Sequence, residues 1–340
     1  MRNIRRLTSS LLRLQTPFFL VAPMILLLLV ARDIAVAQSG VTGNLRAVSG
    51  DFNAADRILL GTKTIYQTNY LSDTVEIFSL SGFDRGTFAT PVKPTGLVFD
   101  DAGNLYVSSN NPAGDSILKF APDGSVTIFA NTGLGAPHGL AFDEAGNLYV
   151  ANPANNTIQK FSPDGIGTEF ANEEDGLHQP VGLAFDTAGN LYVSNTTGGR
   201  MGNGSIEKFT PDGVGSVFND TGVRVPFGLA FGSDGNLYVA NNRSSTIKKF
   251  SPIGQDLGVF AHTGLDSPIG IMFDRAGNLY VANSRINTIE KFSSTGEDLG
   301  VFANTGDGPH FLAMFRPGDL RFESEALESA GKVGGLQDSK

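Results

Sequence analysis

A motif that recurs five times limits the possible folds of this chain more than any other feature. The copies are PTGLVFDDAGNLYVSS from Pro94, PHGLAFDEAGNLYVAN from Pro137, PVGLAFDTAGNLYVSN from Pro180, PFGLAFGSDGNLYVAN from Pro226 and PIGIMFDRAGNLYVAN from Pro268. Their first residues lie 43, 43, 46 and 42 positions apart. Self-similarity at such a period is typical of solenoids and propellers, in which each repeat is one structural unit.

Each repeat contains four strand-sized apolar runs separated by turn residues. One turn is DEAGN at 143–147, where Asp holds the turn and Gly adopts a positive φ. The next turn is SPDG at 162–165, where Pro presets φ and Gly closes the turn. Four antiparallel strands in a period of this length predict the blade of a β-propeller. A β-helix repeats at shorter intervals, and helical repeats would show a 3.6-residue period that is absent here.

The two ends of the repeated region complement each other. Residues 64–90 match the second, third and fourth strands of a repeat, and PHFLAMF at 309–315 matches the missing first strand. We therefore expect an all-β fold, a six-bladed β-propeller of four-stranded blades in which the N- and C-terminal strands share one blade. Sharing a blade removes the open sheet edges that invite aggregation. RPGDLRFES at 316–324 resembles a second strand, so a seventh, partial blade stays open.

The N-terminal segment is predicted to be a signal peptide. Arginines precede an apolar stretch at 18–31, and Ala-Val-Ala at 35–37 fits cleavage before Gln38. The alternative is an uncleaved anchor, but the stretch is shorter than the ~20 residues of a spanning helix. We divide the chain into a signal peptide at 1–37, a lead-in at 38–63, a propeller at 64–315 and a polar tail at 316–340. This organisation predicts a secreted or periplasmic protein without stable membrane insertion after cleavage.

Charge and cysteine content exclude several classes of function. Cleavage at this site removes five Arg and one Asp, which leaves 20 Lys and Arg against 33 Asp and Glu, a net charge of −13. An acidic surface repels phosphate backbones, so we expect no nucleic-acid partner. The chain has no cysteine, which excludes disulfides, thiolate metal sites and thiol catalysis.

The patterns P-x-G-L-A-F-D-x-x-G-N-L-Y-V-A-N and [TS]-I-x-K-F resemble NHL-repeat propellers over residues 64–315. The resemblance implies a six-bladed fold but leaves function open, because a fold does not fix an activity. NHL propellers include protein- and RNA-binding modules, extracellular sensor domains and a peptide-amidating lyase. Related six-bladed folds include gluconolactonase-like hydrolases and virginiamycin-type lyases.

The first strands of the blades are expected to surround a central channel. The residues at the x of P-x-G then line the channel mouth at one end, here called the top face. They are Thr95, His138, Val181, Phe227, Ile269 and His310. None is Asp, Glu or Asn, which argues against the calcium site of the gluconolactonase-like enzymes. We predict no cofactor, with zinc and calcium as the alternatives.

A zinc site of the amidating-lyase kind needs imidazoles from alternate blades. His138 and His310 fit two corners of such a site, but Phe227 occupies the third. His178 can lean in from the neighbouring blade, which keeps zinc open. The simpler interpretation is that the two histidines fill the x position and bond to loop carbonyls.

Residues that differ between repeats are the better candidates for function. The longest turn after a second strand is the insertion at 196–204. The corresponding turns of three adjacent blades carry Arg200, Arg243 and Arg285, which can engage an anion above an apolar floor that includes Phe227. The alternative is that these arginines form exposed ion pairs with acidic residues of neighbouring loops, such as Asp266.

Two hypotheses of function remain open at this point. The first is a non-catalytic binding module that presents its top face to a protein, peptide or small molecule, and we expect it to be a monomer. The second is a lyase or hydrolase that uses top-face histidines, with or without a metal. The candidate ligand-binding residues are His138, His310, His178, Arg200, Arg243, Arg285 and Phe227. Neither hypothesis identifies a ligand or substrate.

Overall fold

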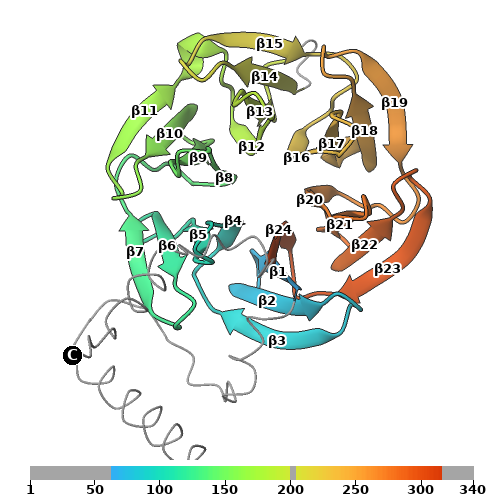
Figure 1. Ribbon diagram of the computed structural model, residues 1–340, viewed down its shortest axis with the longest axis horizontal. Helices are drawn as coiled ribbons and strands as arrows, with labels where there is room; N and C mark the ends of the chain where they lie inside the picture. The colour runs from blue at the N-terminus through green and yellow to red at the C-terminus, as the bar shows by residue number, and fades with distance from the viewer. Residues whose placement is uncertain (1–62, 200–203, 316–340) are drawn as a thin grey trace, which may run out of the picture. The chain divides into compact units, whose positions relative to one another are not determined.

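Each sequence repeat folds into one four-stranded antiparallel sheet. The structure is a computed structural model that describes residues 63–199 and 204–315. In these residues, six such sheets surround a central channel as the blades of a propeller (Figure 1). The predicted fold class is therefore confirmed.

The strands of a blade follow one another from the channel to the rim. Blades one and two consist of β24 (Pro309–Phe315), β1 (Thr64–Asn69), β2 (Thr74–Ser79) and β3 (Asp84–Ala89), and of β4 (Pro94–Phe99), β5 (Leu105–Ser109), β6 (Ser116–Phe120) and β7 (Val126–Ala130). Blades three and four consist of β8 (Leu140–Phe142), β9 (Leu148–Asn152), β10 (Thr157–Phe161) and β11 (Gly167–Ala171), and of β12 (Pro180–Phe185), β13 (Leu191–Asn195), β14 (Ser205–Phe209) and β15 (Gly215–Asn219). Blades five and six consist of β16 (Pro226–Phe231), β17 (Leu237–Asn241), β18 (Thr246–Phe250) and β19 (Asp256–Ala261), and of β20 (Pro268–Phe273), β21 (Leu279–Asn283), β22 (Thr288–Phe292) and β23 (Asp298–Asn304). Two short 3₁₀ turns, η3 (Glu173–Asp175) and η5 (Asn242–Ser244), lie in the connections.

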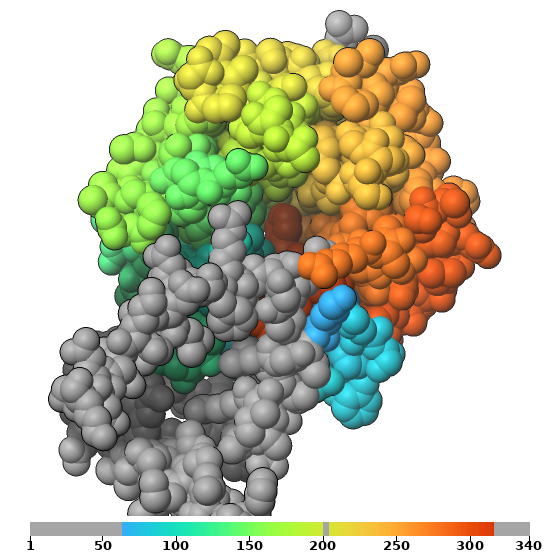
Figure 2. Space-filling model, in the orientation of Figure 1, coloured from blue at the N-terminus to red at the C-terminus, as the bar shows by residue number. Residues whose placement is uncertain are grey.

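Blade one closes the ring as the sequence predicted. Its inner strand β24 pairs antiparallel with β1, with Thr64 opposite Phe315 and Ile65 opposite Met314. The atoms of β24 are visible in dark red inside the hollow at the centre of the ring (Figure 2). The signal peptide, the polar tail and the possible seventh blade lie outside the described residues. None of the described residues belongs to a helix long and apolar enough to cross a membrane.

Aromatic residues connect neighbouring blades. The Tyr149 ring makes edge-to-face contacts with Phe170 of its own blade and Phe185 of the next, both at centroid distances of 5.0 Å. The same tyrosine position is filled in every blade, and such a pair contributes about 0.5–1.5 kcal/mol beyond its buried area. A lysine covers the other side of the ring, since Lys160 Nζ lies 5.0 Å from the Tyr149 centroid and 3.4 Å from Asp143 Oδ2. The lysine head is thus placed over the ring and beside a carboxylate.

The asparagine that ends each LYVAN segment caps a loop. Asn152 Oδ1 accepts a hydrogen bond from Gly135 N, and its Nδ2 donates to Gly133 O and Thr157 Oγ1. Asn195 and Asn241 make the corresponding bonds in blades four and five. These asparagines therefore bond to the loop that enters their own blade and do not form a separate polar site.

Candidate functional site

Only three of the six channel-mouth positions keep partly exposed side chains. Thr95 is fully buried and bonded through Oγ1 to Pro137 O at 2.6 Å, while Val181 and Ile269 are 3% and 5% exposed. The partly exposed residues are His138, Phe227 and His310. The structure therefore concentrates the accessible chemistry of the channel mouth in three of the predicted residues.

Aromatic rings form a row across the channel mouth. Tyr70, which follows β1, stacks on His310 with ring centroids 5.0 Å apart and planes inclined by 10°. The His310 ring lies 6.1 Å from that of His138, although their blades are separated by blade two. Lys93 Nζ lies 5.6 Å from the centre of the Tyr70 ring and adds a cation–π contact at the end of the row. Blades one and three thus jointly form one wall of the channel mouth.

Burial keeps both histidines of this row uncharged at neutral pH. It lowers the pKa of His138, although the hydrogen bond to Ala136 O acts in the opposite direction. Because a carbonyl only accepts, the 3.0 Å contact requires a proton on His138 Nδ1, which leaves Nε2 with a free lone pair. Burial, together with His138, lowers the pKa of His310 to about 3. Among the described residues, the buried Nδ1 of His310 has no hydrogen-bond partner.

Beside His138 the top face is hollowed into a pocket of about 360 Å³, here called the rim pocket. It is lined by blades three, four and five, through Ala136, His138, Pro153, Ala154, Gln179, Val181, Thr196, Val225 and Phe227. Six of these nine residues are apolar. The polar ones are His138, Gln179 and Thr196, and the Thr196 hydroxyl donates to Gln179 O at 3.2 Å. The pocket therefore combines an apolar surface with a few hydrogen-bonding groups, as small-ligand sites do.

Three lining residues of the rim pocket adopt unusual backbone conformations. Ala136, Gln179 and Val225 have φ values of 50°, 49° and 51°, and each immediately precedes the proline that begins a blade. A left-handed conformation is especially rare for a β-branched residue such as Val225. Hydrogen bonds from neighbouring blades hold two of them, since Asp115 Oδ2 accepts from Ala136 N and Asn156 Oδ1 from Gln179 N. The same conformation recurs before the blade-opening proline at Lys93, Ser267 and Gly308, so it belongs to the repeat and does not by itself mark the pocket.

His178 does not join the other two histidines. Its Nδ1 lies 4.0 Å from Glu173 Oε1, its backbone N–H donates to Asn195 Oδ1, and Gly198 packs closely against its ring. It does not line the rim pocket. Within residues 63–199 and 204–315, no three His, Asp or Glu side chains are close enough together to hold a metal ion.

The described arginines also lie apart from the rim pocket. Arg285 is 75% exposed in its side chain, and its guanidinium lies 3.9 Å from Asp266 Oδ1, which matches the ion-pair alternative. Arg243 is an exposed residue of η5 whose backbone N–H donates to Arg224 O. Arg200 lies outside the described residues. Of the seven candidates, the structure brings together His138 with His310, and His138 with Phe227.

The sequence interpretation missed Tyr70 and Gln179. Both stand at positions that differ between repeats: Tyr70 directly follows the capping asparagine, and Gln179 directly precedes a blade-opening proline. The variation between repeats at these two positions could have identified both residues as candidates. It did not indicate which variable residues meet, because that depends on how the blades are arranged around the channel.

Comparisons with known proteins agree with this architecture. Residues 134–161 match the NHL repeat. The structure resembles a chain of the nidogen/laminin complex (TM-score 0.65, 19% identity, covering 75% of this chain and 99% of that one). It also resembles virginiamycin B lyase from Staphylococcus aureus (TM-score 0.50, 19% identity, 69% and 73%) and a streptogramin B lyase (TM-score 0.52, 19% identity, 70% and 72%). No curated protein sequence matches the chain. At these identities the similar structures establish the fold and leave the activity open.

Proposed function

Because this chain is a six-bladed β-propeller with an NHL repeat, we propose that it is an exported, non-catalytic binding module whose rim pocket holds a peptide or small ligand. The main support for the proposal is the position of the pocket. The residues with which blades three, four and five line it differ from blade to blade. Residues that serve the fold repeat in every blade, whereas these do not. The propeller is the rigid support, and its top-face connections supply the contacts.

The chemistry of the pocket favours an apolar group joined to a hydrogen-bond donor. Phe227 and Val181 offer apolar surface, and the unprotonated Nε2 of His138 accepts a hydrogen bond. A side chain packed on Phe227 with a neighbouring N–H directed to His138 satisfies both. We further propose that Arg200, Arg243 and Arg285 bind an anionic group of the ligand away from the rim pocket, where Arg285 would exchange Asp266 for the ligand.

We extend the proposal to localisation and assembly. The protein acts as a monomer in the periplasm or outside the cell, without a cofactor and without a nucleic-acid partner. N-terminal sequencing of the exported protein should begin at Gln38. A chain that retains Met1 in the membrane fraction contradicts export by cleavage, and stoichiometric zinc or calcium in the purified protein contradicts the metal-free proposal.

A binding selection tests the function. The purified propeller is panned against a random 12-residue peptide library, and the affinities of enriched peptides are measured for wild type, Phe227→Ala, His138→Ala and Phe83→Ala. Phe83 is 73% exposed in the turn after β2 and serves as the matched control for loss of a phenyl group. We expect Phe227→Ala and His138→Ala to weaken binding at least about tenfold and the control to leave it unchanged. A selection that yields no binder sensitive to either substitution contradicts the proposal.

The tautomer of His138 favours a second candidate, a lyase or hydrolase. An imidazole that is neutral at pH 7 and fixed through Nδ1 presents Nε2 as a general base. The lyases that share this fold suggest a first substrate, virginiamycin B. Its loss during incubation is measured by mass spectrometry with wild type and His138→Gln. Turnover that requires His138 supports this candidate, and an unchanged substrate contradicts it.

A further inference from the structure

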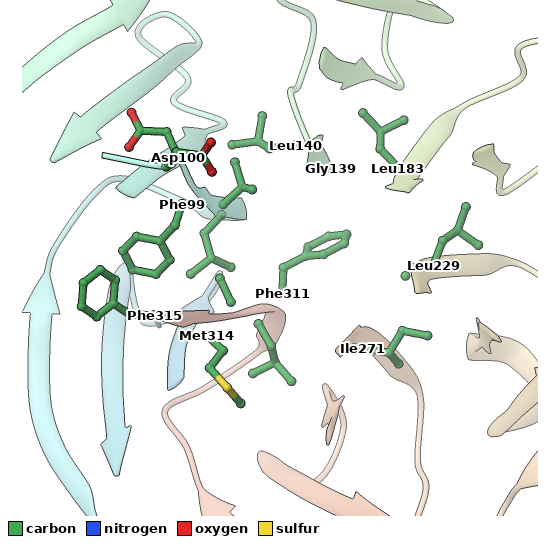
Figure 3. Close-up of a pocket in the computed structure, with 16 residues that line it drawn as sticks. Phe99, Asp100, Gly139, Leu140, Leu183, Leu229, Ile271, Phe311, Met314 and Phe315 are labelled. Carbon is green, nitrogen blue, oxygen red and sulfur yellow. The ribbon is translucent and has the colours of Figure 1, made fainter. Parts of the chain in front are cut away.

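One aliphatic side chain from each blade surrounds the central channel below the channel mouth. These six residues occupy the position after P-x-G, and they are Leu97, Leu140, Leu183, Leu229, Ile271 and Leu312. They line a cavity of about 370 Å³, here called the channel cavity (Figure 3). Each is 5% to 8% exposed, so its neighbours cover most of its surface.

Phe311 sets the upper limit of the channel cavity. The other five blades have glycine at its position, and a Cβ on Gly182, for example, would contact the backbone oxygen of Phe227 in the next blade. Blade one instead has Phe311, whose backbone N–H donates to Thr68 Oγ1 at 3.1 Å. Its ring projects into the channel toward Leu229 and Ile271 (Figure 3). His310, one residue earlier, belongs to the row of rings above.

The charged side chains that line the channel cavity lie together at one end of it. Asp100 and Asp101, at the end of β4 away from the top face, are the charged members of the lining. The Asp100 carboxylate is held by Asn104, whose backbone N–H and Nδ2 donate to it at 2.8 and 2.7 Å. An anion that approaches this end meets like charge, whereas a neutral molecule does not.

We propose that the channel cavity is a binding site for a small, uncharged, apolar molecule of one to three rings. An apolar cavity of about 150 Å³ in another protein accommodates benzene, and the channel cavity is more than twice that size. The aliphatic side chains and the Phe311 ring supply an apolar surface, while Asp100, Asp101 and the backbone at Gly139 and Gly228 add polar groups to the lining. This site is separate from the proposed rim pocket, since the two share no lining residue.

A fluorescent pair of probes tests the chemical class. N-phenyl-1-naphthylamine is neutral, and 1-anilinonaphthalene-8-sulfonate carries the same rings with an added anionic group. We expect saturable binding of one neutral probe per chain and affinity at least about tenfold weaker for the sulfonate. Absence of saturable binding of the neutral probe overturns the proposal, and so does equal affinity for both probes.

The position of the probe is tested with a single reporter. The chain contains no Trp, so Phe311→Trp introduces one fluorophore at the cavity, and Phe83→Trp places one on the surface as the matched control. We expect energy transfer to the bound probe that is several-fold stronger from position 311. Equal transfer from both positions overturns the proposal.

Two further variants separate this site from the rim pocket and do not depend on the reporter. Leu229→Phe fills part of the channel cavity and should weaken the neutral probe at least about tenfold. Phe227→Ala, in the rim pocket, should leave its affinity within about twofold. The reverse pattern places the probe in the rim pocket and overturns the proposal. Retention of the wild-type circular dichroism spectrum shows that each variant is folded.

Discussion

The boundary between blades three and four and the boundary between blades four and five flank the same pocket, yet different contacts hold them. At the first, Asn156 of blade three accepts a hydrogen bond from Gln179 N of blade four at 2.8 Å. The same inter-blade bond recurs at four other boundaries, between Asp73 and Lys93, Asp115 and Ala136, Ser245 and Ser267, and Asn287 and Gly308. At the boundary between blades four and five, Gly204 stands in place of the accepting side chain.

The exception has a steric reason. A Cβ on Gly204 would contact Pro226 Cδ and Asn195 O, so no side chain fits there. Within blade five, an ion pair joins Lys248 Nζ and Asp256 Oδ2 at 2.6 Å, and it packs beside Gly222 of the connection from blade four. The corresponding residue of blade four is the buried Glu207, which approaches Gly176. The comparison teaches that the insertion at 196–204 ends where glycine takes the place of the side chain that accepts the repeated inter-blade bond.

The largest effect is expected at the boundary that closes the ring. Ending the chain after Gly308 removes β24, including the buried Leu312 and Phe315, and exposes the edge of β1. We expect the protein to aggregate or to lose its cooperative thermal transition, measured by circular dichroism and light scattering. The control ends the chain after Phe322 and should behave as wild type. Equal damage from both truncations would show that residues beyond Phe322 contribute to the blades.

The second prediction concerns pH at the boundary between blades five and six. Glu290 takes the place that Lys248 has in blade five, and it faces Asp298 where Lys248 faces Asp256. Burial, followed by the charge and hydrogen bond of Asp298, raises the pKa of Glu290 to about 7. Because the folded-state pKa lies above the unfolded value, this contribution to stability is complete below about pH 4.5 and is lost as the pH rises through 7. The loss is at most about 3 kcal/mol.

Denaturant titrations at pH 4.5, 6 and 8 measure this contribution. Glu290→Gln should flatten the decline of the unfolding free energy between pH 4.5 and 8. Glu290→Lys copies blade five and should stabilise the protein at pH 8 by pairing with Asp298. If the pH profiles of Glu290→Gln and wild type coincide, Glu290 does not carry the pH dependence.

The third prediction tests the close approach at Gly204. Gly204→Ala places a methyl group against Pro226 and Asn195 and should lower the unfolding free energy by about 2 kcal/mol. The control is Ala188→Gly, an exchange of the same two residue types in an exposed turn. Gly300→Ala is unsuitable, because the φ of 86° at Gly300 would strain an alanine. A stable Gly204→Ala protein would mean that the boundary between blades four and five can accept a side chain after all.

The smallest effect is expected where the repeated inter-blade bond is intact. Asn156→Gly removes the acceptor of Gln179 N without straining the backbone, whose φ is 54° there, and should cost about 1 kcal/mol, measured by urea denaturation. Asn155→Gly, at the exposed neighbouring position, is the control. Because Gln179 lines the rim pocket, peptides selected on the top face should also bind Asn156→Gly more weakly. Unchanged stability together with unchanged binding would show that the bond between Asn156 and Gln179 does not support the rim pocket.

The repeated residues were interpreted correctly because their environment is local. The alternating apolar runs and the turn sequences specify each hairpin, and the capping bonds of Asn152 join it to loops nearby in the chain. The match of residues 64–90 and 309–315 predicted closure for a different reason: the pairing joins the two ends of the repeated region, and a missing strand has one vacant place in the ring. Of the candidate residues, His138 lies against His310 and lines the rim pocket with Phe227, whereas His178 faces Glu173 and Arg285 faces Asp266.

The sequence by itself determined the blade, the number of blades in the described ring and the closing strand, because the period and the turn chemistry act over short distances along the chain. The tertiary structure decided which variable residues meet. The pairing of His138 with His310 across blade two, the entry of Phe311 into the channel and the place of Gly204 at a boundary without an accepting side chain all depend on distances between blades. Those distances are set by packing around the whole ring, and no local pattern encodes them.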